Sequence, residues 1–395
     1  MCGVCHTGRV PELDAPYRHL PALASDRSRL QQLFGQDELL PLWVAEPYVP
    51  LALPIRDAIE ERAKAGWYGY ETRPGSVKAA FWEWMATRHG WSNERLSTIV
   101  SPSVGTSIGV LINELTDEGD GVIVQPPVFT DFKPLIVASG RTVVRNPLVL
   151  GAEGYRMDIN ALAELASDPS VRLMILCSPH NPVGRLWSEQ ELRSVARICG
   201  ENDVAVIADE IHADLTLPPN TFAPFAEAAK GIDVTWAATH GPIKSFGLAG
   251  ICDTLLITDS DDVAGQFKAV SNRLHLTRNN IFATAAFETA YREGGEWLDG
   301  LLNLIASNIE RLNEGLTGAI RALPQQATYL SWLDCRQLGL DVPELASWLV
   351  ASGLALSPGH WFGREGAGFA RMSIATDPAV IDDAISRLNR NSSLV

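Results

Sequence analysis

Short apolar runs alternate with amphipathic stretches through the middle of the chain. The runs are rich in β-branched residues and short, so they predict strands. They cover residues 121–125, 171–177, 204–209, 234–239 and 253–258. Between two of them, residues 188–202 predict a helix that opens with Ser188 and Glu191 at the spacing of a capping box. Continuous apolar strands that alternate with helices predict an α/β fold, with a mostly parallel sheet between two layers of helices.

The pattern changes in the C-terminal part of the chain. Residues 296–320 predict one long amphipathic helix, residues 327–335 alternate as a half-buried strand does, and residues 378–390 predict a last helix. This part therefore predicts a smaller α+β domain, completed in part by the N-terminal segment. We divide the chain into an N-terminal segment over 1–46, a large domain over 47–285 and a small C-terminal domain over 286–395.

Composition narrows the classes of partner. The chain has 395 residues, 46% of them hydrophobic, and a formal net charge of −15. Such an acidic chain lacks the basic surface that nucleic acid or anionic lipid requires. No run approaches the ~18 apolar residues of a membrane span, and the N-terminus lacks the apolar core of a secretory signal. We expect a cytoplasmic protein whose partners are small molecules and further copies of itself.

The cysteines do not predict a metal site. Six of them are scattered along the chain, and only Cys2 and Cys5 are closely spaced. That spacing is half of a zinc or redox motif, but no second pair and no pair of histidines follows it. We favour a mobile N-terminal tail over a metal or redox role, and we expect no metal.

Polar residues follow several of the predicted strands, where ligands bind in α/β sheets. Asn181 follows the strand over 171–177, Asp209 closes the next strand, and Lys244 follows the strand over 234–239. Val104 and Gly105 open a predicted helix with small residues, so their backbone N–H groups can bind a phosphate.

Each of the three polar residues has two possible roles. Lys244 lies in a loop of small and apolar residues, where a desolvated amine suits Schiff-base chemistry, although a loop lysine can also reach water. Asp209 either caps the next helix or faces the pyridinium nitrogen of a cofactor. Asn181 either donates to a phenolate oxygen or makes an Asx turn before Pro182.

The motifs together resemble a known family. The matching stretches run in order over residues 40–47, 67–71, 178–192, 209–215, 242–250, 328–336 and 368–376. They resemble the fold-type I enzymes that depend on pyridoxal 5′-phosphate (PLP), with the aspartate aminotransferase fold. Among these, the chain is similar to the MalY/PatB-type cysteine-S-conjugate β-lyases, which are cystathionine β-lyase-like. His212 in "DEIH", where most aminotransferases have Tyr, favours the lyase branch.

The resemblance implies a role for each matching residue. Lys244 would bind PLP as a Schiff base and move the Cα proton, Asp209 would pair with the pyridinium nitrogen, and Asn181 would contact the cofactor O3′. The other cofactor contacts implied are Phe129 on the ring, Val104 and Gly105 on the phosphate, and His212.

The resemblance also implies substrate and partner contacts. Arg371 would hold the substrate α-carboxylate by a bidentate pair, with Asn181 and Ala45 nearby, although Arg371 taken alone also suits a surface ion pair. Tyr70 would take part in catalysis by reaching the phosphate of the neighbouring subunit's cofactor. The resemblance thus implies a homodimer with shared active sites.

The expected reaction is cleavage of a cysteine S-conjugate to a thiol, pyruvate and ammonia, in sulfur-containing natural-product (antibiotic) biosynthesis. The sequence departs from the family pattern at Glu46 for Asp, Phe129 for Tyr, Gly241 for Ser, Gly247 for Asn and Ser373 for Asn. These departures leave two alternatives open, which are decarboxylation coupled to oxidative deamination, giving an aldehyde, and amino transfer.

A nicotinamide dehydrogenase is disfavoured because no G-x-G-x-x-G follows the first strand. A DNA-binding regulator would need a helix-turn-helix stretch before residue 40, and none is seen.

Overall fold

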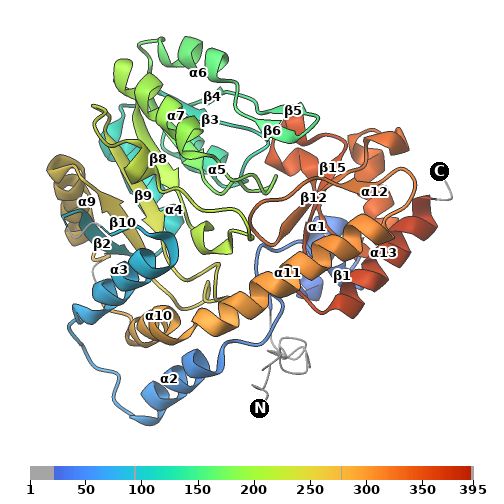
Figure 1. Cartoon of the computed structure of the whole chain (residues 1–395), viewed down its shortest axis with the longest axis horizontal. Helices are drawn as coiled ribbons and strands as arrows, with labels where there is room; N and C mark the ends of the chain where they lie inside the picture. The colour runs from blue at the N-terminus through green and yellow to red at the C-terminus, as the bar shows by residue number, and fades with distance from the viewer. Residues whose placement is uncertain (1–21, 93–94, 277, 393–395) are drawn as a thin grey trace, which may run out of the picture.

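The computed structural model describes residues 22–92, 95–276 and 278–392. Its larger sheet has seven strands in the order β2-β10-β9-β8-β7-β3-β4 (Figure 1). These strands are β2 (Ser97–Ser101), β3 (Gly121–Val124), β4 (Thr142–Arg145), β7 (Val171–Cys177), β8 (Ala205–Asp209), β9 (Trp236–His240) and β10 (Thr254–Thr258). Strand β10 runs antiparallel to both of its neighbours, β2 and β9, and the other four neighbouring pairs are parallel. The prediction of a mostly parallel sheet is therefore confirmed.

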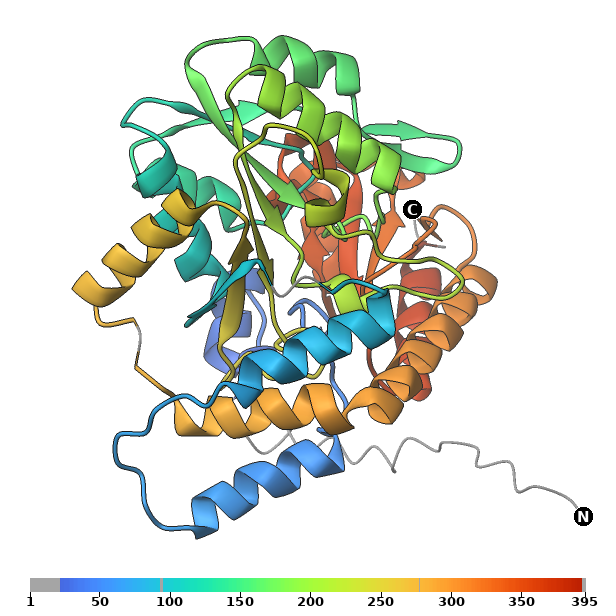
Figure 2. The ribbon, with the colours of Figure 1, turned by 60° about the vertical axis from the view of Figure 1, so that its left-hand side comes forward.

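Helices cover both faces of this sheet, which explains its continuous apolar strands (Figure 2). In β8, Ala205 and Ile207 join the core formed with α4, α5 and α9, whereas Val206 and Ala208 join the core on the opposite face with α6 and α7. The helices of the first core are α4 (Val104–Leu115), α5 (Phe132–Ala138) and α9 (Asp261–Arg273). Those of the second are α6 (Ile159–Ala166), α7 (Glu189–Glu201) and α8 (Phe225–Ala228).

The C-terminal part forms a separate antiparallel sheet in the order β11-β12-β15-β14. Its strands are β11 (Arg321–Ala322), β12 (Leu330–Asp334), β14 (Ser357–Pro358) and β15 (Phe369–Ser373), and its helices are α11 (Gly295–Gly315), α12 (Val342–Ala351) and α13 (Pro378–Ser392). The predicted long helix ends at Gly315 rather than at 320, because Leu316 turns to an extended conformation with φ −72° and ψ 129°. Apolar spacing continues past this turn, so periodicity alone does not detect it.

The N-terminal segment joins the C-terminal part by strand pairing. The short β1 (Leu40–Pro41) lies parallel to β13 (Leu354–Ala355), and α1 (Arg27–Phe34) precedes it. After β1 come α2 (Leu53–Lys64) and α3 (Ser76–His89), joined by an arm over residues 65–75 that projects from the molecule (Figures 1 and 2). Helix α2 packs on α10 (Ile281–Glu293). The domain boundaries expected from the sequence stay a prediction.

The remaining elements are small. They are the hairpin β5 (Val149–Gly151) and β6 (Gly154–Arg156), and single 3-10 turns over Ala213–Leu215, Arg336–Leu338, Gly359–Phe362 and Arg364–Gly366. Within the described ranges, no helix has both the length and the apolar character needed to cross a bilayer. Cys177, Cys199, Cys252 and Cys335 are buried free thiols. The Cys2 and Cys5 pair lies outside the described residues.

The capping box of α7 gives a stability prediction. The Ser188 hydroxyl accepts from the Glu191 N–H at 3.2 Å, and the Glu191 carboxylate accepts from the Ser188 N–H at 2.8 Å. Ser188→Ala removes the first bond, so we expect it to lower the free energy of unfolding by about 1 kcal/mol. Thermal and denaturant unfolding measure this loss. Ser194→Ala, in the middle of the same helix, is the control and should be nearly neutral because Ala is the better helix former; an equal loss in both variants would contradict the capping role.

Candidate active site

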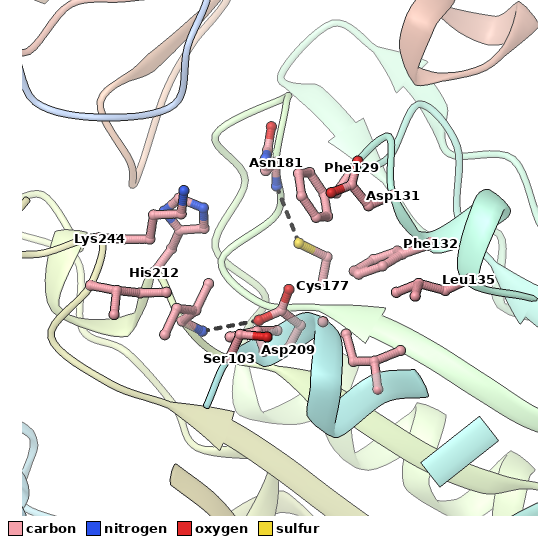
Figure 3. A pocket seen from close by; sticks show the side chains of 15 residues that line it. Ser103, Phe129, Asp131, Phe132, Leu135, Cys177, Asn181, Asp209, His212 and Lys244 are labelled. Atoms are coloured by element: carbon pink, nitrogen blue, oxygen red, sulfur yellow. Dashed lines mark hydrogen bonds between the residues drawn. The ribbon is translucent and has the colours of Figure 1, made fainter. Parts of the chain in front are cut away.

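One cavity of about 320 Å³ lies where β7 and β8 end and α4 begins. Figure 3 shows side chains from these elements and from the loop after β9 turned toward it. Its lining consists of Ser103, Val104, Gly105, Ile108, Phe129, Asp131, Phe132, Leu135, Cys177, Asn181, Asp209, Ile211, His212, Ile243 and Lys244. Seven of the ten residues expected at the site from the sequence are in this lining, and the other three are Ala45, Tyr70 and Arg371.

Lys244 enters the cavity from a tight turn after β9. The turn is closed by a backbone bond from the Phe246 N–H to the Pro242 carbonyl at 3.0 Å. The Lys244 Nζ donates to the Ala45 carbonyl at 2.9 Å. Burial lowers the pKa of Lys244, and the positive charge of Arg371 lowers it further, against the opposing effect of Asp209. The amine is therefore easier to deprotonate than a solvated lysine, as Schiff-base formation requires.

Asp209 is the last residue of β8 and is almost completely buried. Its Oδ1 accepts from the Thr239 hydroxyl at 3.0 Å and from the Ile211 N–H at 3.3 Å. Burial raises the pKa of Asp209 to about 6, although both hydrogen bonds lower it. Among the described residues, no hydrogen bond uses Oδ2. A carboxylate with one free oxygen in a cavity is suited to pair with a cationic ring nitrogen.

Helix α4 presents its N-terminus to the same cavity. Ser103 is the N-cap, and its hydroxyl accepts from the Thr106 N–H at 3.0 Å. The first-turn N–H groups of Val104 and Gly105 have no partner within the helix, because none precedes them. This end of the helix can therefore bind an anionic group such as a phosphate.

Phe129, His212 and Asn181 also belong to the lining. Phe129 lies edge-on to Phe132 with the ring centroids 5.5 Å apart. The Nδ1 of His212 is buried without a partner within the described residues, and burial, with the charges of Lys244 and Arg371, lowers the pKa of His212 to about 3. His212 is therefore neutral near pH 7. The Asn181 N–H donates to the Cys177 sulfur at 3.4 Å (Figure 3).

Arg371, in β15 of the other sheet, reaches the cavity through Asn181. Its guanidinium donates to the Asn181 Oδ1 at 3.1 Å, to the Trp43 carbonyl at 2.7 Å and to the Ser357 hydroxyl at 3.2 Å. Only 6% of Arg371 is exposed, and burial lowers its pKa to about 10. It forms no salt bridge with any described residue. A surface ion pair is thus contradicted, and a buried cation without an acidic partner suits a ligand carboxylate.

Tyr70 and Ala45 lie outside the lining. Tyr70 is 86% exposed on the arm between α2 and α3, where the Arg278 guanidinium lies 5.6 Å from its ring centroid. It makes no contribution to the cavity of its own chain. Ala45 contributes only its carbonyl, which accepts from the Lys244 amine and, at 3.0 Å, from the Tyr329 hydroxyl.

The departures from the family pattern have structural causes at two glycines. Gly247 has φ +68°, a left-handed conformation that Asn also tolerates, and a Cβ there would lie 3.1 Å from Pro47. At Gly241 a Cβ would lie 3.2 Å from the Thr254 Cα, so the close approach of β10 crowds a serine. The half-buried Glu46 has a pKa raised by burial, against the opposing charge of Lys244.

Sequence reasoning missed several residues at the site. Thr239 and Cys177 are the register partners of Asp209 in the two neighbouring strands, so aligning the predicted strand ends could have found them. Tyr329 contacts Ala45 across 284 positions of sequence, and no local signal predicts such a contact.

The cavity fits PLP because its groups complement several parts of the cofactor. The α4 N-terminus suits the phosphate, Asp209 suits the protonated ring nitrogen, Phe129 offers an aromatic face, and Lys244 offers an amine for the aldehyde. Without a bound cation, the buried Asp209 carboxylate destabilises the fold at neutral pH.

Asp209→Asn should therefore stabilise the cofactor-free protein. The pKa of Asp209 is raised in the folded state, so its contribution is fully present below about pH 4 and is lost as the pH rises to about 6. Above that pH, we expect the free energy of unfolding of the variant to exceed that of the wild type by roughly 2–3 kcal/mol. Unfolding at several pH values measures the difference, which should vanish in acid; a constant difference would contradict this assignment.

Comparisons with known proteins agree with this geometry. Residues 52–388 match the model of the family described as aminotransferase class I and II. The chain is 36% identical over 364 residues to the cystathionine beta-lyase PatB of Bacillus subtilis, covering 90% of this chain and 93% of that protein. It is 29% identical over 361 residues to Protein MalY of Escherichia coli, covering 90% and 92%.

Two solved structures share the fold over nearly the whole chain. A PLP-bound putative aminotransferase from Clostridium difficile superposes with a TM-score of 0.90 at 32% identity, covering 96% of this chain and 98% of that one. Cystalysin from Treponema denticola, which contains a PLP cofactor, superposes with a TM-score of 0.88 at 26% identity, covering 95% and 96%. The chain belongs to the aminotransferase class I and II family, in its MalY/PatB branch.

Proposed function

We propose that this protein is a PLP-dependent carbon–sulfur lyase that cleaves a cysteine S-conjugate to a thiol, pyruvate and ammonia. The observation that carries the proposal is one cavity lined by a lysine of lowered pKa and a buried carboxylate. Beside it lies Arg371, which forms no salt bridge with a described residue. The relatives named cystathionine beta-lyase support the carbon–sulfur bond as the target. The role in natural-product biosynthesis and the cytoplasmic location stay predictions.

The bound cofactor supplies an electron sink for the charge left at Cα when a proton is removed. Each residue then has a distinct task. The Lys244 Nζ would hold the cofactor and, once the substrate amine has replaced it there, would take the Cα proton, and Asp209 would keep a proton on the ring nitrogen. The N–H groups of Val104 and Gly105 would bind the phosphate, and neutral His212 adds no positive charge beside the amine.

Arg371 favours elimination over loss of carbon dioxide. Its guanidinium, placed by the Asn181 side chain and the Trp43 carbonyl, would stabilise the negative charge of the substrate carboxylate. Decarboxylation removes that charge, so the same interaction opposes it. Phe129 carries no hydroxyl, which leaves the proton transfer at Cα to Lys244.

We also propose a homodimer in which Tyr70 serves the partner's cavity. Trp67, Tyr68 and Tyr70 are 55%, 58% and 86% exposed on one arm. Three exposed aromatic residues on a projecting segment are typical of an interface. The arm contributes no side chain to the cavity of its own chain, which supports a role for it at the cavity of the partner subunit.

A product assay tests the reaction. We expect the wild type, given a cysteine S-conjugate, to release thiol, pyruvate and ammonia in equal amounts. Lys244→Ala should lose the visible absorbance of lysine-bound PLP. It should also lower kcat at least about a thousandfold, because the same amine both binds the cofactor and takes the Cα proton. Carbon dioxide with an aldehyde, or a keto acid that keeps its sulfur, would contradict elimination, and persistent absorbance would contradict the role of Lys244.

Mixed dimers test the contribution of Tyr70. Tyr70→Phe and Lys244→Ala should each be nearly inactive alone. If Tyr70 acts across the interface, hybrid dimers regain one intact site, and random mixing restores about a quarter of wild-type activity. Rates measured after subunit exchange give the answer, and no recovery would place Tyr70 outside the partner's site.

A further inference from the structure

A buried cluster lies behind the lysine turn, centred on Asp214 in the 3-10 turn after β8. Its Oδ2 accepts from the Ser245 hydroxyl at 3.0 Å, and Ser245 directly follows Lys244. Its Oδ1 accepts from the Trp84 indole N–H at 2.8 Å and lies 2.8 Å from the His89 Nε2. No task in the proposed reaction uses any of these four groups.

The cluster is charged and largely buried. Only 5% of Asp214 is exposed, and Ser245 is fully buried. Burial alone would raise the pKa of Asp214, but the hydrogen bonds from His89, Trp84 and Ser245 together lower it below its usual value. The group is therefore a carboxylate near pH 7. Hydrogen bonds to an ionised acceptor are shorter and about twice as strong as neutral ones. The Asp214 carboxylate therefore holds the Ser245 hydroxyl strongly.

Asp214 lies on the same short segment as Asp209, the acid in the cavity. Asp209 and Asp214 belong to residues 209–215, which are tightened by backbone bonds from Ala213 to Glu210 and from Leu215 to His212, both at 2.9 Å. Asp209 binds Thr239, which precedes Lys244, whereas Asp214 binds Ser245, which follows it. One rigid segment thus holds the lysine turn at both ends.

We propose that Asp214 is a positioning residue, which acts through the Ser245 hydroxyl to hold the Lys244 amine at a set place relative to Asp209. The inference rests on the proposed role of Lys244. The contact from Nζ to the Ala45 carbonyl restrains only the tip of a long flexible side chain. The bond to Ser245 restrains the backbone from which that side chain starts. A small displacement of a reacting group lowers a rate steeply.

Ser245→Ala tests the link while leaving Trp84 and His89 on Asp214. We expect the variant to capture PLP covalently about tenfold more slowly, as followed by the growth of visible absorbance, and to lower kcat about tenfold. KM should stay within about twofold, because Arg371 and Asn181 are untouched. Asp214→Asn, which keeps the shape and removes the charge, should act in the same direction.

Ser352→Ala is the matched control. Ser352 is also buried, and its hydroxyl donates to the Trp348 carbonyl at 3.0 Å, in the C-terminal part of the chain. We expect a similar loss of melting temperature with unchanged capture and kcat. Wild-type rates in Ser245→Ala, or equal slowing in Ser352→Ala, would overturn the inference. Lys244→Ala separates the two proposals: if that variant still shows lysine-bound absorbance, the proposed function itself fails.

Discussion

The parallel pairing of β7, β8 and β9 is the constraint on which the site depends. Parallel strands end at one edge of the sheet, so the residues that come after them meet there. The register places Cys177, Asp209 and Thr239 side by side. The loops that continue from these strands add Asn181 and Lys244 to the same cavity. Because the strands are buried on both faces, this edge is rigid, and the acid and the amine keep a fixed relation.

The site retains charges that the fold alone would not favour. Asp209 and Arg371 are almost completely buried, and neither has an oppositely charged described partner within ion-pair distance. Such groups destabilise a protein until a ligand compensates them. Asp214, by contrast, accepts a hydrogen bond at each carboxylate oxygen and is a structural charge. Buried charges without a partner thus mark the groups that bind the ligands, and buried charges with partners mark the groups that position those residues.

The second sheet and the N-terminal segment close the site from the other side. The Trp43 and Ala45 carbonyls accept from Arg371 and Lys244, which come from two different sheets. Segment 40–47 thus connects the substrate end with the cofactor end. Its strand pairing with β13 keeps it in place. Changes in this segment, such as Glu46, therefore lie near the Lys244 amine.

The sequence by itself determined the strands, their alternation with helices and the residues at their ends. Burial on both faces leaves continuous apolar runs, and parallel topology brings the residues at the strand ends together. The family pattern named Asn181, Asp209 and Lys244, in chain order. Only the tertiary structure decided that Arg371 is buried with no acidic partner among the described residues, that Tyr70 is exposed, and that Ala45 and Tyr329 are in contact. Those facts depend on how segments far apart in the sequence pack together, and local periodicity does not predict such packing.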